Sequence, residues 1–498
     1  MQRAWSRVSD QLALVAVLAA VFLGALDQTV IVVALPSVVA DLQIPFDKID
    51  QAAWIVSGYL LGYTVALPVM GRFADVRGRR LALAIALATF AVGSMGCALA
   101  GSLLVLVVAR IVQAVGGGAL LPVGIAIASE RYVTDRRALA IGVIGAVAEA
   151  GGVVGPLYGA GIIAWIDWRW IFWLNIPAAL LLLVVASRGL KESKRESGSI
   201  DVIGATLIGA ALTFQVLGLA HAAIDVGAID LRGVFLVLAV VALLAFVVWE
   251  MRIAEPLLDL HLFRDVGFFV AILGGLLLGG ALIVAMVDVP LYAATILNLS
   301  ASDGGLLLMR LTVFVPVGAI VGGLLAHGFG LRLPTLLGFV TAGAGLALVG
   351  SWGTTPGSQL LWLSLAVTGS GFGLLIAPLS TAAVNRGGPR REASAAALFS
   401  VARLTGMSVG LSALTAWGLQ RFDALAGQIP LPLPRIGESA ADAQARLLAY
   451  NQAIVQVGSQ VYHEMFVGAA IICLVGVAVV LFLRPSATNV PTSRGEQR

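Results

Sequence analysis

Charged residues are scarce in this 498-residue chain: Asp, Glu, Lys and Arg make up 12% of it, whereas hydrophobic residues make up 59%. Soluble domains carry about 25% charged residues, so the composition predicts an integral membrane protein. Cysteine is nearly absent, and both cysteines lie in apolar runs, which excludes a disulfide framework. The four histidines have no metal-ligand spacing, so neither a metal site nor a cofactor is expected.

The chain also lacks the segments that an enzyme or an ATP-driven pump would need. It has no nucleophile–base set and no soluble segment large enough for a catalytic or nucleotide-binding domain. The glycine run at 116–118 lies inside an apolar stretch and does not follow a strand, so it does not predict a phosphate-binding loop. The net charge of +4 gives no reason to expect nucleic acid as a partner. We therefore expect a membrane protein that is not an enzyme.

Long apolar runs are what the chain has in abundance. Runs of about 18–25 apolar residues predict helices that cross a membrane. Fourteen are expected, near residues 12–40, 50–70, 81–100, 103–129, 138–163, 170–188, 201–220, 233–250, 267–292, 304–327, 332–350, 359–384, 392–418 and 460–484. The signal is weakest for the runs near 201–220 and 332–350.

The distribution of Lys and Arg indicates the orientation, because cytosolic loops are enriched in these residues. If the N-terminus is inside, 22 of the 31 Lys and Arg residues fall in cytosolic segments and 6 in outer ones. Both termini are therefore expected in the cytosol.

One acid, Asp27, stands in the middle of the first apolar run. A charge at that depth costs several kcal/mol, so the group must face a polar cavity, find a partner or take up a proton. Two interpretations stay open. Asp27 could bind and release protons in a transport cycle, or it could be paired permanently with an Arg on a neighbouring helix.

Ionisable residues inside the predicted spans comprise three acids and three bases: Asp27, Arg110, Glu149, Asp288, Arg310 and Arg403. Equal numbers allow full pairing. We expect Asp27 to pair with Arg110 in the N-terminal half, and Glu149 to pair with Arg403 across the two halves. A pair that forms in one access state and breaks in the other would couple access to protonation, although static pairing stays open. Pairing of Arg310 with Glu149 or with Asp288 also stays open.

The loop after the second run reads Gly71-Arg-Phe-Ala-Asp-Val-Arg-Gly-Arg-Arg80. Two glycines permit close backbone approach and a tight turn, and Asp75 can accept a hydrogen bond from a neighbouring Arg or cap a helix. The loop resembles the signature loop of the major facilitator superfamily, with Phe73 in place of the usual Leu. The resemblance implies that Gly71, Asp75 and Arg79 act as a conformational latch between helices.

The same resemblance implies an all-α, polytopic fold with two six-helix bundles, to which two helices are added here, and alternating access between the bundles. The chain then divides into an N-terminal bundle (1–188), a cytosolic linker with the two inserted helices (189–266), a C-terminal bundle (267–484) and a cytosolic tail (485–498). The C-terminal bundle includes a long outer loop (419–459). Within this loop, residues 440–450 have a helix-like pattern that could cap the outer mouth, lie on the membrane surface or form a packed connector.

Further segments resemble the fourteen-helix drug:proton antiporter family. They are Leu26–Pro36 in the first run, Ala109–Gly118 in the fourth, and Asp167–Pro177 before the sixth. In that family the arginine that matches Arg110 is linked to proton transfer. The fifth run contains a stretch similar to the antiporter motif of exporters, with Ala160 in place of its last glycine; the matching residues are Gly151, Gly155, Pro156 and Gly159. Small residues allow close helix packing and proline bends a helix, and the motif implies export.

Segments around Glu149, Val287–Leu291 and Val401–Met407 resemble a mycobacterial subgroup described as triacylglyceride exporters, which also affects drug tolerance. The resemblance implies proton-coupled export of an apolar lipid, with multidrug efflux as the alternative and a non-transporting scaffold or sensor as a third interpretation. The proton gradient would drive transport without a cofactor. We expect a monomer in a bacterial inner membrane, surrounded by membrane lipids, with an envelope lipoprotein as a candidate partner.

Overall fold

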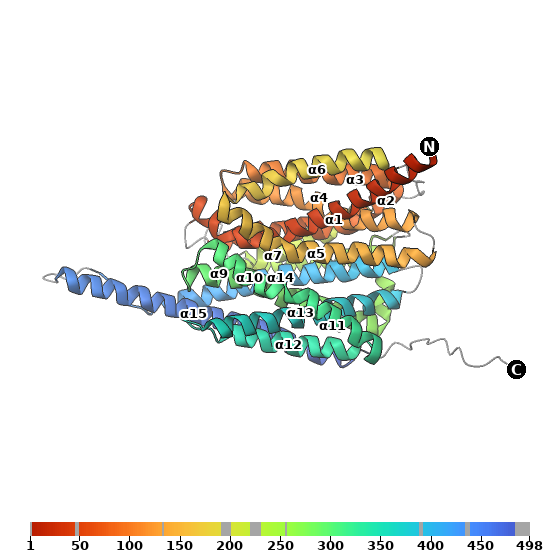
Figure 1. The fold of residues 1–498 in the computed structure, drawn as a ribbon. Helices are drawn as coiled ribbons and strands as arrows, with labels where there is room; N and C mark the ends of the chain where they lie inside the picture. Colours follow the sequence, from red (N-terminus) through yellow and green to blue (C-terminus); the bar gives the residue numbers. More distant parts are fainter. Residues whose placement is uncertain are drawn as a thin grey trace.

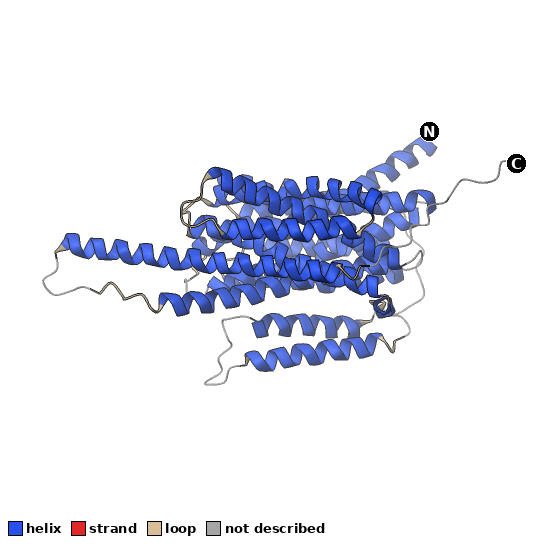
Figure 2. Cartoon of the chain, turned by 90° about the horizontal axis from the view of Figure 1, so that it is seen from below, coloured by secondary structure: helices blue, strands red, loops and turns tan. Residues whose placement is uncertain are grey.

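The computed structural model describes residues 2–44, 49–131, 134–190, 201–219, 231–253, 256–387, 392–433 and 439–483. These residues contain no strand, and their helices run side by side in one elongated bundle (Figures 1 and 2). Long apolar segments form helices because backbone N–H and C=O groups in lipid must find their partners within the protein.

Six helices form the N-terminal part of the bundle: α1 (Gln2–Asp41), α2 (Ile49–Arg77), α3 (Arg79–Ala98), α4 (Leu103–Arg131), α5 (Thr134–Trp165) and α6 (Arg169–Gly189). Helix α1 packs against α4, α5 and α6, while α4 also packs against α2 and α3. The middle of α1, which carries Asp27, is therefore enclosed by its neighbours.

The remaining helices are α7 (Val202–Leu219), α8 (Arg232–Glu250), the short η2 (Leu260–Arg264), α9 (Val266–Thr295), α10 (Ala301–Thr312), α11 (Phe314–Phe329), α12 (Arg332–Gly350), α13 (Ser358–Gly387), α14 (Glu392–Ala426) and α15 (Ala440–Val480). Helices α7 and α8 pack on each other, and α7 contacts α2 and α14. The two halves meet where α2 packs on α14, α5 on α10 and α1 on α9.

Fourteen segments among the described residues are long and apolar enough to cross a membrane, which confirms the predicted number. The two weakest runs are both present, as α7 and α12. The span expected near 304–327 consists of two helices, α10 and α11, which meet at Val313. The break has a local cause: Pro316 has no N–H to donate to the carbonyl of Thr312, four residues earlier.

The segment expected as an outer loop at 419–459 is largely helical. Helix α14 continues to Ala426, and α15 begins at Ala440 and runs without interruption into its membrane span. The side chain of Ser439 caps α15 by accepting a hydrogen bond from the N–H of Asp442. Arg421 binds Glu464 through two hydrogen bonds of 2.9 and 3.2 Å, which ties α14 to α15. The first turns of α15 project beyond the bundle (Figure 1), so residues 440–450 form part of a longer helix.

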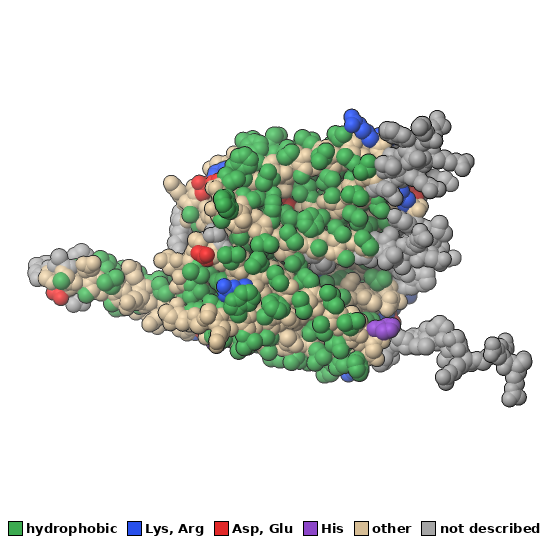
Figure 3. Space-filling view, in the orientation of Figure 1, with side chains coloured by type: hydrophobic (Ala, Val, Ile, Leu, Met, Phe, Trp, Pro, Cys, Tyr) green, Lys and Arg blue, Asp and Glu red, His purple; other side chains and the backbone are tan. Residues whose placement is uncertain are grey.

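Hydrophobic side chains cover the middle of the bundle, and charged side chains lie towards its two ends (Figure 3). Several large apolar side chains of the membrane-spanning helices are more than half exposed, including Leu104, Leu181, Val241 and Leu324. An apolar surface this extensive would be a liability in water and is the expected surface for contact with lipid.

Candidate functional site

A buried ion pair joins Asp27 of α1 to Arg110 of α4. The Nη1 atom of Arg110 lies 2.6 Å from Oδ2 of Asp27, and both side chains are 0% exposed. The pairing predicted for these two residues is confirmed. The guanidinium also lies over the ring of Tyr59, with Cζ 3.9 Å from the ring centroid. Burial removes competing water, so the electrostatic attraction within this pair is much stronger than at a surface.

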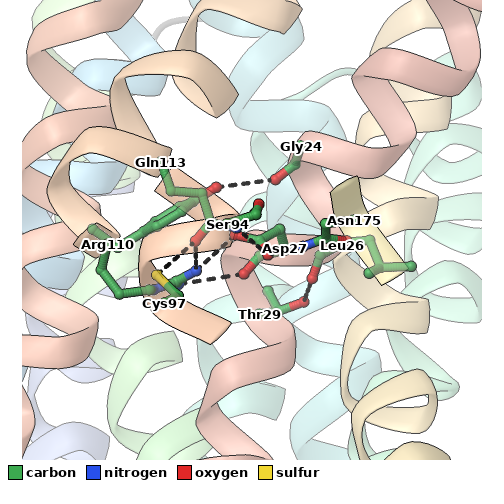
Figure 4. Close-up of polar contacts among 10 residues, drawn as sticks. Gly24, Leu26, Asp27, Thr29, Ser94, Cys97, Arg110, Gln113 and Asn175 are labelled. Carbon is green, nitrogen blue, oxygen red and sulfur yellow. Dashed lines mark hydrogen bonds and ion pairs between the residues drawn. The ribbon is translucent and has the colours of Figure 1, made fainter. Parts of the chain in front are cut away.

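Two amides complete the surroundings of the Asp27 carboxylate (Figure 4). Oδ1 of Asp27 accepts hydrogen bonds from Nε2 of Gln113 at 3.0 Å and from Nδ2 of Asn175 at 2.6 Å. Gln113 in turn accepts from Nη1 of Arg110 at 2.8 Å and donates to Oγ of Ser94 at 2.7 Å. Helices α1, α3, α4 and α6 therefore meet in one buried network. A buried charge is stable only when it is paired and hydrogen-bonded in this way.

Glycines allow the helices to come close enough for this network. A Cβ atom on Gly93 of α3 would lie 2.3 Å from the backbone nitrogen of Gln113. One turn further along α4, a Cβ on Gly117 would lie 2.7 Å from the hydroxyl of Tyr59 in α2. The glycine run at 116–118 thus serves helix packing, in agreement with the exclusion of a phosphate-binding loop.

The antiporter-like segment of α5 packs against the helix that carries Asp27. A Cβ on Gly151, Gly155 or Gly159 would come within 3.0 Å of an α1 carbonyl oxygen. Pro156 has no N–H and leaves the carbonyl of Gly152 without its helical donor. The hydroxyl of Thr29 in α1 donates to that carbonyl at 2.9 Å. The motif therefore locks α5 to α1 through a hydrogen bond that the proline makes available.

Across the interface, Gly305 of α10 faces Ala160, the residue that replaces the last glycine of the motif. A Cβ on Gly305 would lie 2.5 Å from the Cβ of Ala160. The glycine that this crossing requires is therefore supplied by α10 rather than by α5. This contact brings the C-terminal half directly against the antiporter-like helix.

A cavity of about 200 Å³ lies between the halves, bordered by α1, α2, α9, α14 and α15. Its walls consist mainly of aliphatic side chains, together with Phe422 and Tyr462. Asp288 of α9 is the one charged residue among those that line it. The cavity is distinct from the Asp27 network, whose residues do not line it.

The sequence of the chain matches the family model of the Major Facilitator Superfamily over residues 17–411. The chain belongs to the major facilitator superfamily. It is 37% identical over 488 residues to a triacylglyceride transporter of Mycolicibacterium hassiacum, which covers 93% of this chain and 90% of the relative. It is 34% identical over 495 residues to a triacylglyceride transporter of Mycobacterium tuberculosis, with 93% and 92% coverage.

Solved structures of the superfamily have the same fold. A bacterial homologue of the human lysosomal transporter Spinster aligns with a TM-score of 0.63 at 17% identity, over 96% of this chain and 99% of the other. The xylose transporter XylE from E. coli aligns with a TM-score of 0.58 at 16% identity, over 92% and 95% of the two chains. The protein is thus a multi-pass bacterial membrane transporter and not an enzyme.

The signature loop of the superfamily connects three helices of the N-terminal half. Arg79 lies 3.7 Å from Asp75 of α2 and 2.5 Å from Glu130 at the end of α4. Gly78 has φ 103°, a backbone conformation that favours glycine, at the start of α3. Gly71 does not have the tight contact that we expected, since the nearest atom to an added Cβ would be Pro122 Cβ at 3.5 Å.

The other ionisable residues inside the spans do not share one site, and each has its own surroundings. Arg310 lies over the ring of Trp362, with Cζ 4.6 Å from its centroid. Arg310 and Asp288, both within the described chain, form no ion pair with each other in this conformation. Glu149 belongs to α5, but its side chain lies outside the described part of the chain, as does any pair that it forms. Arg403 is half-buried in α14, where its backbone carbonyl packs against Gly279 of α9.

Sequence reasoning missed the uncharged members of the Asp27 network. Gln113 lies three residues after Arg110, which places both side chains on one face of α4. Asn175 stands inside the segment Asp167–Pro177, whose resemblance to the family was noted without a role for the amide. An amide or hydroxyl inside an apolar run is the available signal, because such a group needs a buried partner. Ser94 and Thr29 follow the same rule.

Proposed function

We propose that the protein exports an apolar lipid of the acylglyceride type by proton-coupled alternating access. The observation that carries the proposal is the cavity between the halves, whose lining is almost entirely aliphatic and aromatic. Such a lining favours a ligand that has little polar surface to desolvate. The two mycobacterial relatives, which are named triacylglyceride transporters, support the same substrate class.

Proton coupling is assigned to Asp27 and Arg110. Protonation of Asp27 would remove the negative charge that compensates the guanidinium, which is itself 0% exposed. An uncompensated buried charge is strongly destabilising, so proton uptake favours a rearrangement that gives Arg110 water or another partner. Because the two residues lie on α1 and α4, this rearrangement would move helices of the N-terminal bundle. One proton that moves through 100 mV supplies about 2.3 kcal/mol to such a step.

A second pair, Glu149 with Arg403, is proposed to form between the halves in one access state and to break in the other. The positions of the two residues support this pairing, because α5 and α14 belong to opposite halves.

Both termini are proposed to lie in the cytosol. Single cysteines at positions 195 and 440 would then be labelled by a membrane-impermeant reagent from opposite faces of oriented vesicles, and labelling from the same face would overturn the topology.

A transport assay with purified protein in liposomes would distinguish lipid export from efflux of cationic drugs. A fluorescent diacyl- or triacylglyceride and a cationic dye would be followed side by side, with protein-free liposomes as the control. Lipid movement that requires the protein supports lipid export. Dye movement without lipid movement would reject it in favour of multidrug efflux.

A further inference from the structure

Arg310 of α10 differs from Arg110 and Arg403 because it has no ion-pair or hydrogen-bond partner within the described chain. Its guanidinium lies over the ring of Trp362 in α13, with Cζ 4.6 Å from the ring centroid. Arg310 is half-buried within Asp303–Phe329, a segment long and apolar enough to cross a membrane. A charge at such a position costs several kcal/mol unless it finds a polar partner, so the guanidinium requires an anion or water.

The face of α10 that carries Arg310 is turned towards lipid. Leu306 and Val313 lie four residues before and three residues after it, on the same helical stripe, and they are 44% and 50% exposed. Gly305, which packs against Ala160 of α5, lies about 140° around the helix from Arg310. Figure 3 shows a basic side chain at the surface near α10, among hydrophobic ones. Arg310 therefore belongs to the lipid-facing surface and not to the interface between the halves.

Trp362 places the pair near one end of the membrane span. It is 48% exposed and lies four residues after the start of α13. The hydroxyl of Tyr292, near the end of α9, donates to the carbonyl of Gly353, just before α13, so α10 and α13 begin at the same end of the bundle. Tryptophan is enriched at the boundary between lipid and water. Side chains tilt towards the N-terminus of a helix and long basic ones extend towards the boundary, so the guanidinium of Arg310 reaches headgroup depth.

The donors of Arg310 are available to a ligand. A guanidinium that stacks on an indole uses its face and keeps its N–H groups, which form a planar fork, for other partners. The acid that precedes Arg310 by two turns, Asp303, accepts a hydrogen bond from the hydroxyl of Ser300 at the start of α10. Neither α11 nor α13 contains an Asp or a Glu. The lipid headgroups at this depth are thus the source of an anion, and the fork matches the oxygens of a phosphate.

We propose that Arg310 and Trp362 form a site on the lipid-facing surface that binds the phosphate of an anionic phospholipid. The guanidinium binds the phosphate oxygens, the indole fixes the guanidinium, and an acyl chain lies along the exposed stripe at Leu306 and Val313. A headgroup with a net negative charge is preferred to a zwitterionic one, because it neutralises the arginine without adding a second cation. In the proposed orientation this lipid belongs to the outer leaflet. The site is separate from the cavity between the halves and does not depend on which substrate is exported.

Lipid binding to the full-length protein in detergent tests the site. The protein would be titrated with dioleoyl phosphatidylglycerol, dioleoyl phosphatidylcholine or dioleoylglycerol, and the bound lipids counted by native mass spectrometry. We expect the first phosphatidylglycerol to bind about tenfold more tightly than either of the other lipids. Arg310→Leu should abolish this preference, and Trp362→Leu should weaken phosphatidylglycerol binding by about threefold. Inorganic phosphate in excess should not displace the lipid, because it has no acyl chain to place on the stripe.

Arg332→Leu is the matched control, since it removes an exposed arginine at the start of α12 and leaves the site intact. Arg310→Lys keeps the charge without the planar fork and should bind phosphatidylglycerol with intermediate affinity. An equal loss in Arg310→Leu and Arg332→Leu would show general attraction between charges and overturn the proposal. A wild type without preference, or displacement by inorganic phosphate, would also overturn it. If Arg310→Leu does not fold, Arg310→Lys and Trp362→Leu carry the test, and unchanged binding by both would reject the site.

Discussion

Removal of one partner from the Asp27–Arg110 pair should destabilise the fold far more than removal of both. In Arg110→Met, the Asp27 carboxylate keeps its two amide donors but becomes an uncompensated charge at 0% exposure. The loss of one partner from a buried pair costs about 3 to 5 kcal/mol. Asp27→Asn should cost a similar amount, because the new amide would direct N–H groups at the guanidinium 2.6 Å away.

The double variant Asp27→Asn with Arg110→Met contains no buried charge at this position. Oδ1 of the new asparagine can still accept from Gln113 and Asn175, and methionine fills most of the arginine volume. We expect the double variant to be more stable than the sum of the single effects by about 2 to 3 kcal/mol. Equilibrium unfolding in mixed micelles, with helicity as the signal, would give the free energies of all four proteins. If the single effects add within about 0.5 kcal/mol, the pair does not hold the network together as described.

Three further predictions concern two observed contacts and the proposed Glu149–Arg403 pair. Thr29→Val should lower the unfolding free energy by about 0.6 to 1.7 kcal/mol, because it removes the donor to the Gly152 carbonyl. Thr64→Val is the control, since the Thr64 hydroxyl donates only within its own helix. Equal losses of unfolding free energy in mixed micelles would contradict the role given to Pro156. Partial desolvation tends to raise the pKa of Asp265, but hydrogen bonds from Arg386 and from the N–H of Phe268 bring the pKa below its usual value. The ionised carboxylate of Asp265 therefore stabilises the folded protein. This contribution is complete above the unfolded pKa of about 3.9 and is lost as the pH falls through the lower folded pKa. The melting temperature of Asp265→Asn should therefore depend less on pH below about 4 than that of the wild type, and identical pH profiles would exclude the contribution. Charge reversal at Glu149 or Arg403 should impair transport, and the double reversal should restore part of it; a double variant as inactive as either single one would count against a direct pair.

The helices were predictable because their apolar runs leave few alternatives in a membrane. All fourteen spans were found from hydrophobicity, including α7 and α12, whose signals are weakest. The break at Val313 and the uninterrupted continuation of residues 440–450 into the last membrane span were not predicted. Pro316 could have indicated the first, but proline also occurs inside continuous helices here, such as α5 with Pro156. In α15, the helix-like pattern at 440–450 was recognised, but the sequence did not show that this helix continues from its serine cap into the membrane span without a break.

Of the candidate site, the charged pair followed from the sequence and its surroundings did not. Asp27 and Arg110 stand out because a charge inside an apolar run requires compensation. Asn175 could not be assigned to the same site, since the crossing of α6 over α1 depends on tertiary packing. For the same reason the sequence could not show that Arg310 lies on Trp362 while Asp288 faces a cavity.

Proton-driven lipid movement tests the central proposal most directly. Liposomes with an imposed pH gradient would contain wild-type protein or Asp27→Asn, and transfer of a fluorescent triacylglyceride between leaflets would be timed with and without an uncoupler. The account predicts transfer that requires the gradient, stops with the uncoupler and is absent in Asp27→Asn, whose helicity in the same liposomes must match that of the wild type. Equal transfer by the two proteins, or transfer that ignores the gradient, would contradict proton coupling through Asp27.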